Sequence, residues 1–185
     1  MNFAPLAIPG VWEITLQPRG DARGYFMRTY DEKFYADHGL VTEWVQENQS
    51  LSTEVGIVRG LHFQRGESAE TKLVRALEGR VLDVVVDIRR GSPTFGQHVA
   101  VELSAENKNA IYVPRGFAHG FCVMETPAVV AYKVDNFYDP QAEGGLLWND
   151  PALGINWPVA EAITSDKDKL WPTLADLEPV DPEAR

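Results

Sequence analysis

Short segments rich in strand-forming residues, separated by turn-forming residues, fill the sequence from residue 12 to residue 134. Most of them are rich in Val, Ile, Tyr or Phe, which favour strands. The stretches between them, such as EGR, RRGSPTFG, SAENKN and PRG, contain residues typical of turns. Short strands at this spacing predict an all-β sandwich or barrel. The expected strands are WEITL, YFMRTY, EWVQENQS, GIVRGLHFQ, TKLVRALE, RVLDVVVDI, QHVAVEL, AIYVP and AVVAYKV.

Outside these strands the sequence predicts little regular structure. The segment YDEKFYADHGL is the best helix candidate, because Asp31 can cap its start and Gly39 can end it. From about Glu143 onward the chain is richer in Pro and Trp, with a short helical turn expected near SDKDKL. We expect this tail to wrap around the barrel, so that residues 1–185 form a single domain.

Net charge and cysteine content limit the class of protein. The formal net charge is -10, which argues against a nucleic acid or an anionic membrane as the main partner. No apolar run approaches the roughly 18 residues of a membrane-spanning helix, and the N-terminus lacks the pattern of a signal peptide. Because Cys122 is the single cysteine, no internal disulfide can form. These features together predict a cytoplasmic protein.

Against this acidic background, cations gather around the segment GIVRGLHFQRGESAETKLVR. Any one of them could be ordinary surface charge. A local group of cations on an acidic protein, however, favours an anionic small molecule as the ligand. The group comprises Arg19, Arg23, Arg28, Arg59, Arg65, Lys72 and Arg75.

The segment VPRGFAHGF has the form P-x-G-x-x-H, in which Pro114 and Gly116 shape a turn and His119 follows it. This pattern resembles the second conserved motif of the cupin barrels, whose histidine is often a metal ligand. The first cupin motif would supply an H-x-H pair, but here His62 is followed by Gln64. Because glutamine is a weak ligand for transition metals and no H-x-H pair is present, the sequence disfavours a metal site.

His62 can be interpreted as a metal ligand, a hydrogen-bonded core histidine or a base. It shares a strand face with Gln64, and Lys72 follows across a polar loop. A lysine inside a barrel is costly unless it binds an anion or stabilises a developing one. On a regular strand Arg59 and His62 face opposite sides, so a shared pocket requires a bulge at Gly60.

Tyr132, in the segment AYKVDNFY, is also open to two interpretations. Val130 and Val134 share its strand face, as expected for a core tyrosine whose hydroxyl finds a partner. If the same side chain faced His62, it could act as an acid opposite a base.

Taken in order, these segments resemble one family, the dTDP-4-dehydrorhamnose 3,5-epimerases of nucleotide-sugar metabolism. The resemblance covers nearly the whole chain, and the ordered set of motifs is far more specific than any single motif. The motifs are DARGYF, VQENQS, GIVRGLHFQ, KLVR, VLDVVVDIRRGSPTFG, ELSAEN, VPRGFAHGF, AYKVDNFY, LWNDPALGINWP and SDKD.

The resemblance implies a cupin-type jelly roll with a few short helices and neither metal nor other cofactor, assembled as a homodimer with exchanged N-terminal strands. The implied reaction inverts C3 and C5 of a nucleoside-diphospho-4-keto-6-deoxyhexose, with dTDP-4-dehydro-6-deoxy-D-glucose giving dTDP-4-dehydro-L-rhamnose as the leading case. A base removes a proton next to the 4-keto group, an enolate forms, and an acid returns a proton from the opposite face.

By the same resemblance, four residues match catalytic positions. His62 matches the base, and Asp168 matches the carboxylate that orients its imidazole. Lys72 matches the group that stabilises the enolate oxygen. Tyr132 matches the acid on the opposite face.

Further residues match positions that bind the substrate. Guanidinium groups suit phosphate oxygens, so two arginines are expected to hold the sugar or the diphosphate. Polar and aromatic side chains are expected to contact the rest of the nucleotide sugar. The two arginines are Arg23 and Arg59, and the other residues are Phe26, Gln46, Asn48, His119 and Tyr138.

One departure from the family pattern concerns specificity. After RGYF the family usually has F-x-E, whereas this chain has Arg28 in FMRTY. Such a charge reversal in the nucleotide region is either a tolerated surface change or a sign of an altered nucleotide or sugar preference. The motifs also leave open a 3- or 5-monoepimerase and a 3,4-ketoisomerase. Two alternatives from other classes are a metal-dependent cupin oxygenase and a non-catalytic sugar-nucleotide-binding barrel.

Overall fold

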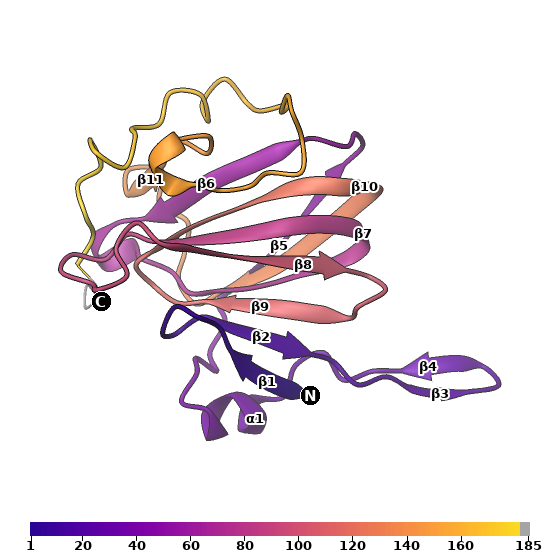
Figure 1. Cartoon of the computed structure of the whole chain (residues 1–185). Coiled ribbons are helices and arrows are strands. Elements are labelled where there is room, and N and C mark those ends of the chain that lie inside the picture. Colours follow the sequence, from indigo (N-terminus) through magenta and orange to yellow (C-terminus); the bar gives the residue numbers. More distant parts are fainter. Residues whose placement is uncertain (182–185) are drawn as a thin grey trace.

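The computed structural model describes residues 1–181, whose regular secondary structure consists almost entirely of antiparallel strands (Figure 1). Nine strands form one curled sheet, and β3 and β4 form a separate hairpin. The all-β prediction is therefore confirmed. The strands are β1 (Asn2–Pro5), β2 (Trp12–Thr15), β3 (Arg19–Asp21), β4 (Gly24–Phe26), β5 (Gln46–Ser52), β6 (Val58–Gln64), β7 (Lys72–Asp87), β8 (His98–Ser104), β9 (Asn109–Val113), β10 (Phe117–Val134) and β11 (Glu143–Gly145).

Two long strands, β7 and β10, form the frame of the barrel. They pair with each other along most of their length, and each then pairs with different neighbours at its two ends. The start of β7 pairs with β9 and its second half with β8. The first half of β10 pairs with β6 and its second half with β5. The two strands therefore link both layers of the barrel.

The predicted division of β7 into two strands at EGR is wrong. Gly79 has φ +69°, and a Cβ there would lie 2.5 Å from the carbonyl oxygens of Glu125 and Pro127. The glycine therefore lets β7 bend tightly against β10 without reversing direction. The register between the two strands shifts at the bend: β10 has extra residues between Val123 and Val129, and β7 has one between Ala76 and Glu78.

Other strand boundaries also differ from the prediction. Residues 117–123 were expected only to follow a turn, yet they form the first half of β10. The segment YFMRTY contributes just its first two residues to β4, since pairing with β3 ends at Phe26. Three short strands, β1, β3 and β11, were not predicted from the sequence.

Helices are few and short. Helix α1 (Glu32–Asp37) begins after Asp31 and is followed by Gly39 at φ +67°, as predicted. The Asp31 carboxylate, however, accepts a hydrogen bond from Arg28 at 2.7 Å and does not cap the helix. The segment SDKDKL forms a turn, and the 3-10 helices are η1 (Gly66–Ser68) and η2 (Pro151–Leu153). Within residues 1–181, no helix has the length and apolarity needed to cross a membrane.

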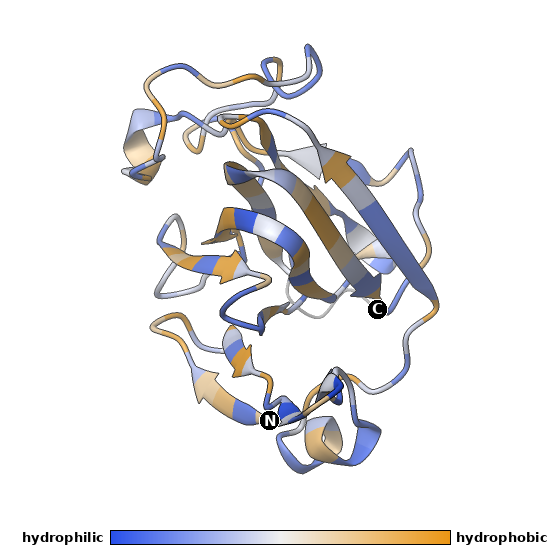
Figure 2. Cartoon of the chain, turned by 90° about the vertical axis from the view of Figure 1, so that its right-hand side faces the viewer, coloured by the Kyte–Doolittle hydropathy of each residue, from blue (hydrophilic) through white to orange (hydrophobic). Residues whose placement is uncertain are grey.

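Both faces of the second half of β7 are buried, which explains its nearly continuous hydrophobic sequence. Val81 and Val85 belong to the cluster inside the barrel, together with Phe121 of β10. Val84 and Val86 belong to a second cluster on the opposite face, which residues of the tail complete, including Leu153, Leu177 and Val180. Figure 2 shows hydrophobic residues along the barrel strands, and Figure 1 shows the yellow tail crossing the same side as β6 and β11.

Asp87 fixes the turn that follows β7. Its side chain is fully buried and accepts hydrogen bonds from the guanidinium and backbone of Arg89 and from the hydroxyls of Ser92 and Thr94. Burial alone would raise the pKa of Asp87, but these donors together lower it to about 2. The carboxylate therefore stabilises the folded state.

We expect Asp87→Asn to lower the free energy of unfolding by about 2 kcal/mol at pH 7, since the folded pKa is about 2 and the ordinary value is 3.8. The contribution is fully present above pH 3.8 and disappears as the pH falls through 2, so the variant should lose that part of the pH dependence. Urea titrations followed by tryptophan fluorescence measure both effects. The exposed Asp37→Asn is the control, and equal stability of the two variants at pH 7 would contradict the assignment.

Candidate active site

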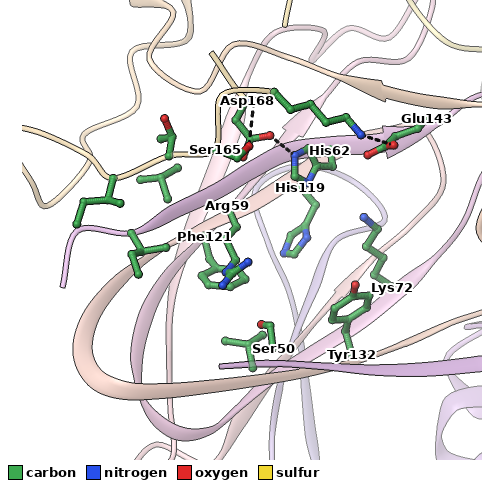
Figure 3. A pocket seen from close by; sticks show the side chains of 16 residues that line it. Ser50, Arg59, His62, Lys72, His119, Phe121, Tyr132, Glu143, Ser165 and Asp168 are labelled. Carbon is green, nitrogen blue, oxygen red and sulfur yellow. Dashed lines mark hydrogen bonds and ion pairs between the residues drawn. The ribbon is translucent and has the colours of Figure 1, made fainter. Parts of the chain in front are cut away.

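A cavity of about 540 Å³ opens on the hydrophobic cluster inside the barrel and is closed on one side by the tail segment 163–168 (Figure 3). Its wall combines apolar residues of the barrel with ionisable side chains. Six residues singled out from the sequence line it, from β6, β7, β10 and the tail. They are Arg59, His62, Lys72, His119, Tyr132 and Asp168.

A bulge at Gly60 brings Arg59 and His62 into the same cavity. On β10, His119 pairs with His62 and Phe121 pairs with Arg59, so two steps along β10 match three along β6. Gly60 has φ +128°, and a Cβ there would lie 2.8 Å from the carbonyl oxygen of His119. The bulge predicted at Gly60 is therefore confirmed, and only glycine fits the position.

His62 and Asp168 form a close pair across the cavity rim. His62 Nε2 lies 2.6 Å from Asp168 Oδ1, and the Asp168 side chain is almost completely buried. Burial lowers the pKa of His62, and the hydrogen bond and charge of Asp168 oppose this shift in part. With Nε2–H donated to the carboxylate, the free lone pair of the neutral imidazole is on Nδ1.

Trp171, which carried no signal in the sequence, supports this pair. Its Nε1–H donates to Asp168 Oδ1 at 3.2 Å, and its ring lies edge-on to His62. The indole packs on Gly145 of β11, where a Cβ would come within 2.3 Å of the ring. The backbone N–H of Asp168 donates to Ser165 Oγ at 3.1 Å. Asp168 is thus oriented by its own turn and by the indole.

Lys72 lies at the start of β7 with its side chain largely buried. Its Nζ is 3.2 Å from Oε1 of Glu70, which is equally buried and was not identified from the sequence. The anion expected near a lysine inside the barrel is therefore supplied in part by the chain itself. Figure 3 shows the ammonium end of Lys72 directed between His62 and Tyr132.

Tyr132 projects from β10 into the cavity, with its hydroxyl pointing toward the side occupied by His62 (Figure 3). Burial is the main cause that raises the pKa of Tyr132, and the charge of Glu70 adds to the shift while Arg59 opposes it. The phenol therefore stays protonated at neutral pH and can donate a proton.

His119 forms a second histidine–carboxylate pair. Its Nε2 lies 2.8 Å and 3.0 Å from the two oxygens of Asp83, which is completely buried on β7. Burial raises the pKa of Asp83, and the nearby His119 opposes the shift. The sequence signal that could have identified Asp83 is a charged residue inside the apolar run VLDVVVDI.

Gln64, at the position of the second histidine of an H-x-H motif, has its amide fully engaged. Its Nε2 lies within 3.1 Å of the Ser68 carbonyl, Glu70 Oε2 and the Phe137 carbonyl, and its Oε1 accepts from the Asp139 N–H at 2.6 Å. Among residues 1–181, no group of three or more His, Cys, Asp or Glu side chains is arranged to hold a metal ion.

Three other predicted contacts lie beside the cavity. Gln46 and Asn48 lie on the inward face of β5, because they are four and two residues before Ser50, which lines the cavity. Their amides bond to each other at 2.9 Å. Tyr138 is half exposed, and its hydroxyl donates to Glu143 at 2.8 Å. Glu143 lines the cavity and also pairs with Lys167, and neither was identified from the sequence.

The structure does not bring Arg23 and Phe26 into the cavity of their own chain. They lie on the hairpin β3–β4, which projects away from the barrel because its strands pair only with each other (Figure 1). Arg23 is exposed and bonds Asp21 at 2.7 Å, and Phe26 is 69% exposed. Phe26 and Arg28 line a separate hollow beside α1.

Comparison with known proteins agrees with this arrangement. Residues 5–176 match the family described as dTDP-4-dehydrorhamnose 3,5-epimerase. A dTDP-4-dehydrorhamnose 3,5-epimerase of Shigella flexneri is 47% identical over 169 residues, which are 91% of this chain and 93% of that protein. A dTDP-4-dehydrorhamnose 3-epimerase of Streptomyces niveus is 39% identical over 91% of this chain and 82% of that protein.

Among solved structures, a dTDP-6-deoxy-D-glucose-3,5-epimerase of Legionella pneumophila in complex with dTDP-4-keto-L-rhamnose superposes with a TM-score of 0.92. It is 39% identical, and the match covers 99% of each chain. The cupin-type jelly roll predicted from the sequence is therefore confirmed. Sequence and structure together establish that this chain belongs to the dTDP-4-dehydrorhamnose 3,5-epimerase family.

Proposed function

We propose that this chain is an epimerase that inverts C3 and C5 of dTDP-4-dehydro-6-deoxy-D-glucose to give dTDP-4-dehydro-L-rhamnose. One observation carries the proposal: a neutral histidine paired with a carboxylate, a lysine and a protonated tyrosine surround one cavity. Family membership along almost the whole chain supports the same reaction, and the Legionella pneumophila relative binds the expected product.

The proposed mechanism uses the acidity of C–H bonds next to the 4-keto group. His62 Nδ1 takes the proton from C3 or C5, and the C–H electron pair moves into an enolate whose oxygen is stabilised by the Lys72 ammonium. Tyr132 then donates its phenolic proton to the same carbon from the opposite face, which inverts the centre. Proton exchange with solvent then returns the His62 imidazolium to its neutral form and reprotonates the Tyr132 phenolate.

Two neighbouring carboxylates play supporting parts in this scheme. Asp168 holds Nε2–H of His62 and stabilises the imidazolium that forms when Nδ1 is protonated. Asp83 holds His119 in the cavity wall, where its imidazole can contact the substrate. Arg59, whose guanidinium reaches the cavity from β6, is suited to the diphosphate.

Inversion at C3 alone is the alternative that a specific observation favours. The Streptomyces niveus relative is a 3-epimerase and matches 91% of this chain. A base, an oxyanion stabiliser and an acid serve one centre or two by the same chemistry, so these residues support both reactions equally. The number of sugar carbons that take up deuterium from heavy water distinguishes the two reactions.

The projecting hairpin supports a homodimer as part of the proposal. Arg23 and Phe26 lie outside their own cavity on β3–β4, whereas β1 and β2 join the sheet of their own chain. We propose that the hairpin reaches the cavity of a second copy, where Arg23 contacts the diphosphate and Phe26 the nucleotide. A cytoplasmic location, supported by the lone buried Cys122, completes the proposal.

In heavy water, the enzyme should introduce deuterium at both C3 and C5 of dTDP-4-dehydro-6-deoxy-D-glucose, as observed by NMR. His62→Ala should lower the exchange rate by about 100-fold or more while leaving the fold intact, because a general base typically contributes 10²–10⁴-fold. The control is His98→Ala on β8, outside the cavity. Deuterium at one centre only would identify a monoepimerase, and no deuterium uptake with the wild-type enzyme would exclude the proposed function.

The acid limb of kcat/KM should lie below pH 6.5, because His62 must be neutral and burial lowers its pKa from that value. Asp168 raises the pKa of His62, so Asp168→Asn should move the limb further toward acid. Asp168→Asn should also lower the pH-independent value of kcat/KM by about 100-fold, since the imidazole loses its orienting partner. A limb that moves toward higher pH in the variant would contradict the assignment of His62 as the base.

Mixing two inactive variants tests the exchanged hairpin. Co-refolded His62→Ala and Arg23→Ala/Phe26→Ala chains should regain about a quarter of wild-type activity, because half of the dimers are mixed and each has one intact site. The control mixture, His62→Ala with Lys72→Met, should stay inactive, since both residues line the cavity of one chain. Equal recovery in both mixtures, or none in either, would exclude the shared site.

A further inference from the structure

The contact between Glu70 and Lys72 places a carboxylate next to the proposed oxyanion-stabilising group. The two side chains are about equally buried, with 12% and 11% of their surfaces exposed, and Oε1 lies 3.2 Å from Nζ. A lysine ammonium is a point charge on a flexible four-carbon stem, so its position depends on its partners. Glu70 is therefore in a position to decide where the Lys72 ammonium lies.

Glu70 is itself held by a network of short contacts. Its second oxygen, Oε2, accepts from Gln64 Nε2 at 3.0 Å. Gln64 is buried on β6, and its Oε1 accepts the Asp139 N–H at 2.6 Å. Two hydrogen bonds and one ion pair thus connect the β10–β11 connection, through Gln64 and Glu70, to the ammonium of Lys72. Figure 3 shows the position of Lys72 in the cavity.

The loop that carries Glu70 is also fastened to the barrel. Asn136 Nδ2 donates to the carbonyls of Glu67 at 2.7 Å and Ala69 at 3.2 Å. The backbone N–H of Thr71 donates to Asp135 at 2.6 Å. A carboxylate on so fixed a loop can serve as a rigid support for a catalytic side chain.

We propose that Glu70 is a positioning residue, held by Gln64, that fixes the Lys72 ammonium for stabilising the enolate. This inference rests on the proposed function. The negative charge of Glu70 near an enolate is unfavourable in itself, but one of its oxygens accepts a hydrogen bond from the Gln64 amide and the other is paired with the Lys72 ammonium. Preorganisation of a donor outweighs this repulsion, because an unfixed ammonium must be reoriented in every turnover.

Glu70→Gln keeps the shape of the side chain and removes its charge, so it tests this role directly. We expect kcat for deuterium exchange to fall by about 10- to 100-fold while KM changes less than about threefold, because the contact supports the transition state more than the bound substrate. In a Lys72→Met background, the same substitution should change the residual exchange rate less than about twofold. The matched control is Glu67→Gln, an exposed glutamate on η1.

A second readout does not depend on turnover. A held ammonium gives a lysine ¹H–¹⁵N signal in NMR spectra, which Lys72→Met assigns, and this signal should persist in Glu67→Gln and vanish in Glu70→Gln. Its absence from the wild type, or its persistence in Glu70→Gln, would overturn the proposal, as would equal losses of kcat in the two backgrounds. If the wild type exchanges no deuterium, the epimerase function fails, and the NMR signal still decides whether Glu70 holds Lys72.

Discussion

The pairing of β7 with β10 is the constraint on which the rest of the structure depends. It runs from Phe117 opposite Asp87 to Val134 opposite Lys72. Although the register shifts at the bend, the pairing resumes beyond it and aligns Lys72 with Val134, which lies about 60 positions later in the sequence. Tyr132 pairs with Val74, two residues beyond Lys72, so the proposed acid and the proposed oxyanion stabiliser share one face of adjacent strands. A slip of one strand by one residue would place the two side chains on opposite faces of the sheet.

The proposed base is positioned by contacts of a different kind. His62 depends on the Gly60 bulge for its direction, and on the tail for its carboxylate, which lies 106 residues later. The tail is held by hydrophobic contacts of Leu177 and Val180 on the outer face of β7 and by the indole of Trp171 over Gly145. The hydrophobic packing outside the barrel therefore determines the geometry of the His62–Asp168 pair inside it.

How far the sequence could predict this site depends on the range of each contact. Alternation identified the strands, and the ordered motifs identified His62, Lys72, Tyr132 and Asp168, which lie together. The carboxylates beside them were missed for two reasons. Glu70 lies in a polar loop, where a charge is usually solvated, and Asp83 is marked by its apolar surroundings in VLDVVVDI, but that pattern does not name His119 as its partner. Arg23 and Phe26 were matched to a motif, but a motif does not say where the hairpin β3–β4 projects, and the structure places both residues outside the cavity of their own chain. Gly79 was taken for a turn because the same positive φ serves a turn and a strand bend.

Charge balance distinguishes Arg59, the proposed ligand of the diphosphate, from the two lysines that line the cavity. Lys72 is paired with Glu70, and Lys167 is paired with Glu143. Arg59 differs, because within residues 1–181 its guanidinium contacts only neutral groups, Ser52 Oγ and the Leu51 carbonyl, each at 3.2 Å. An incoming dianion can therefore bind Arg59 without displacing a carboxylate, whereas at Lys72 it would have to compete with one. Under the proposed function, this difference lets a protein with a net charge of -10 bind an anionic substrate through Arg59 and keep the diphosphate away from Lys72, the proposed enolate-stabilising group.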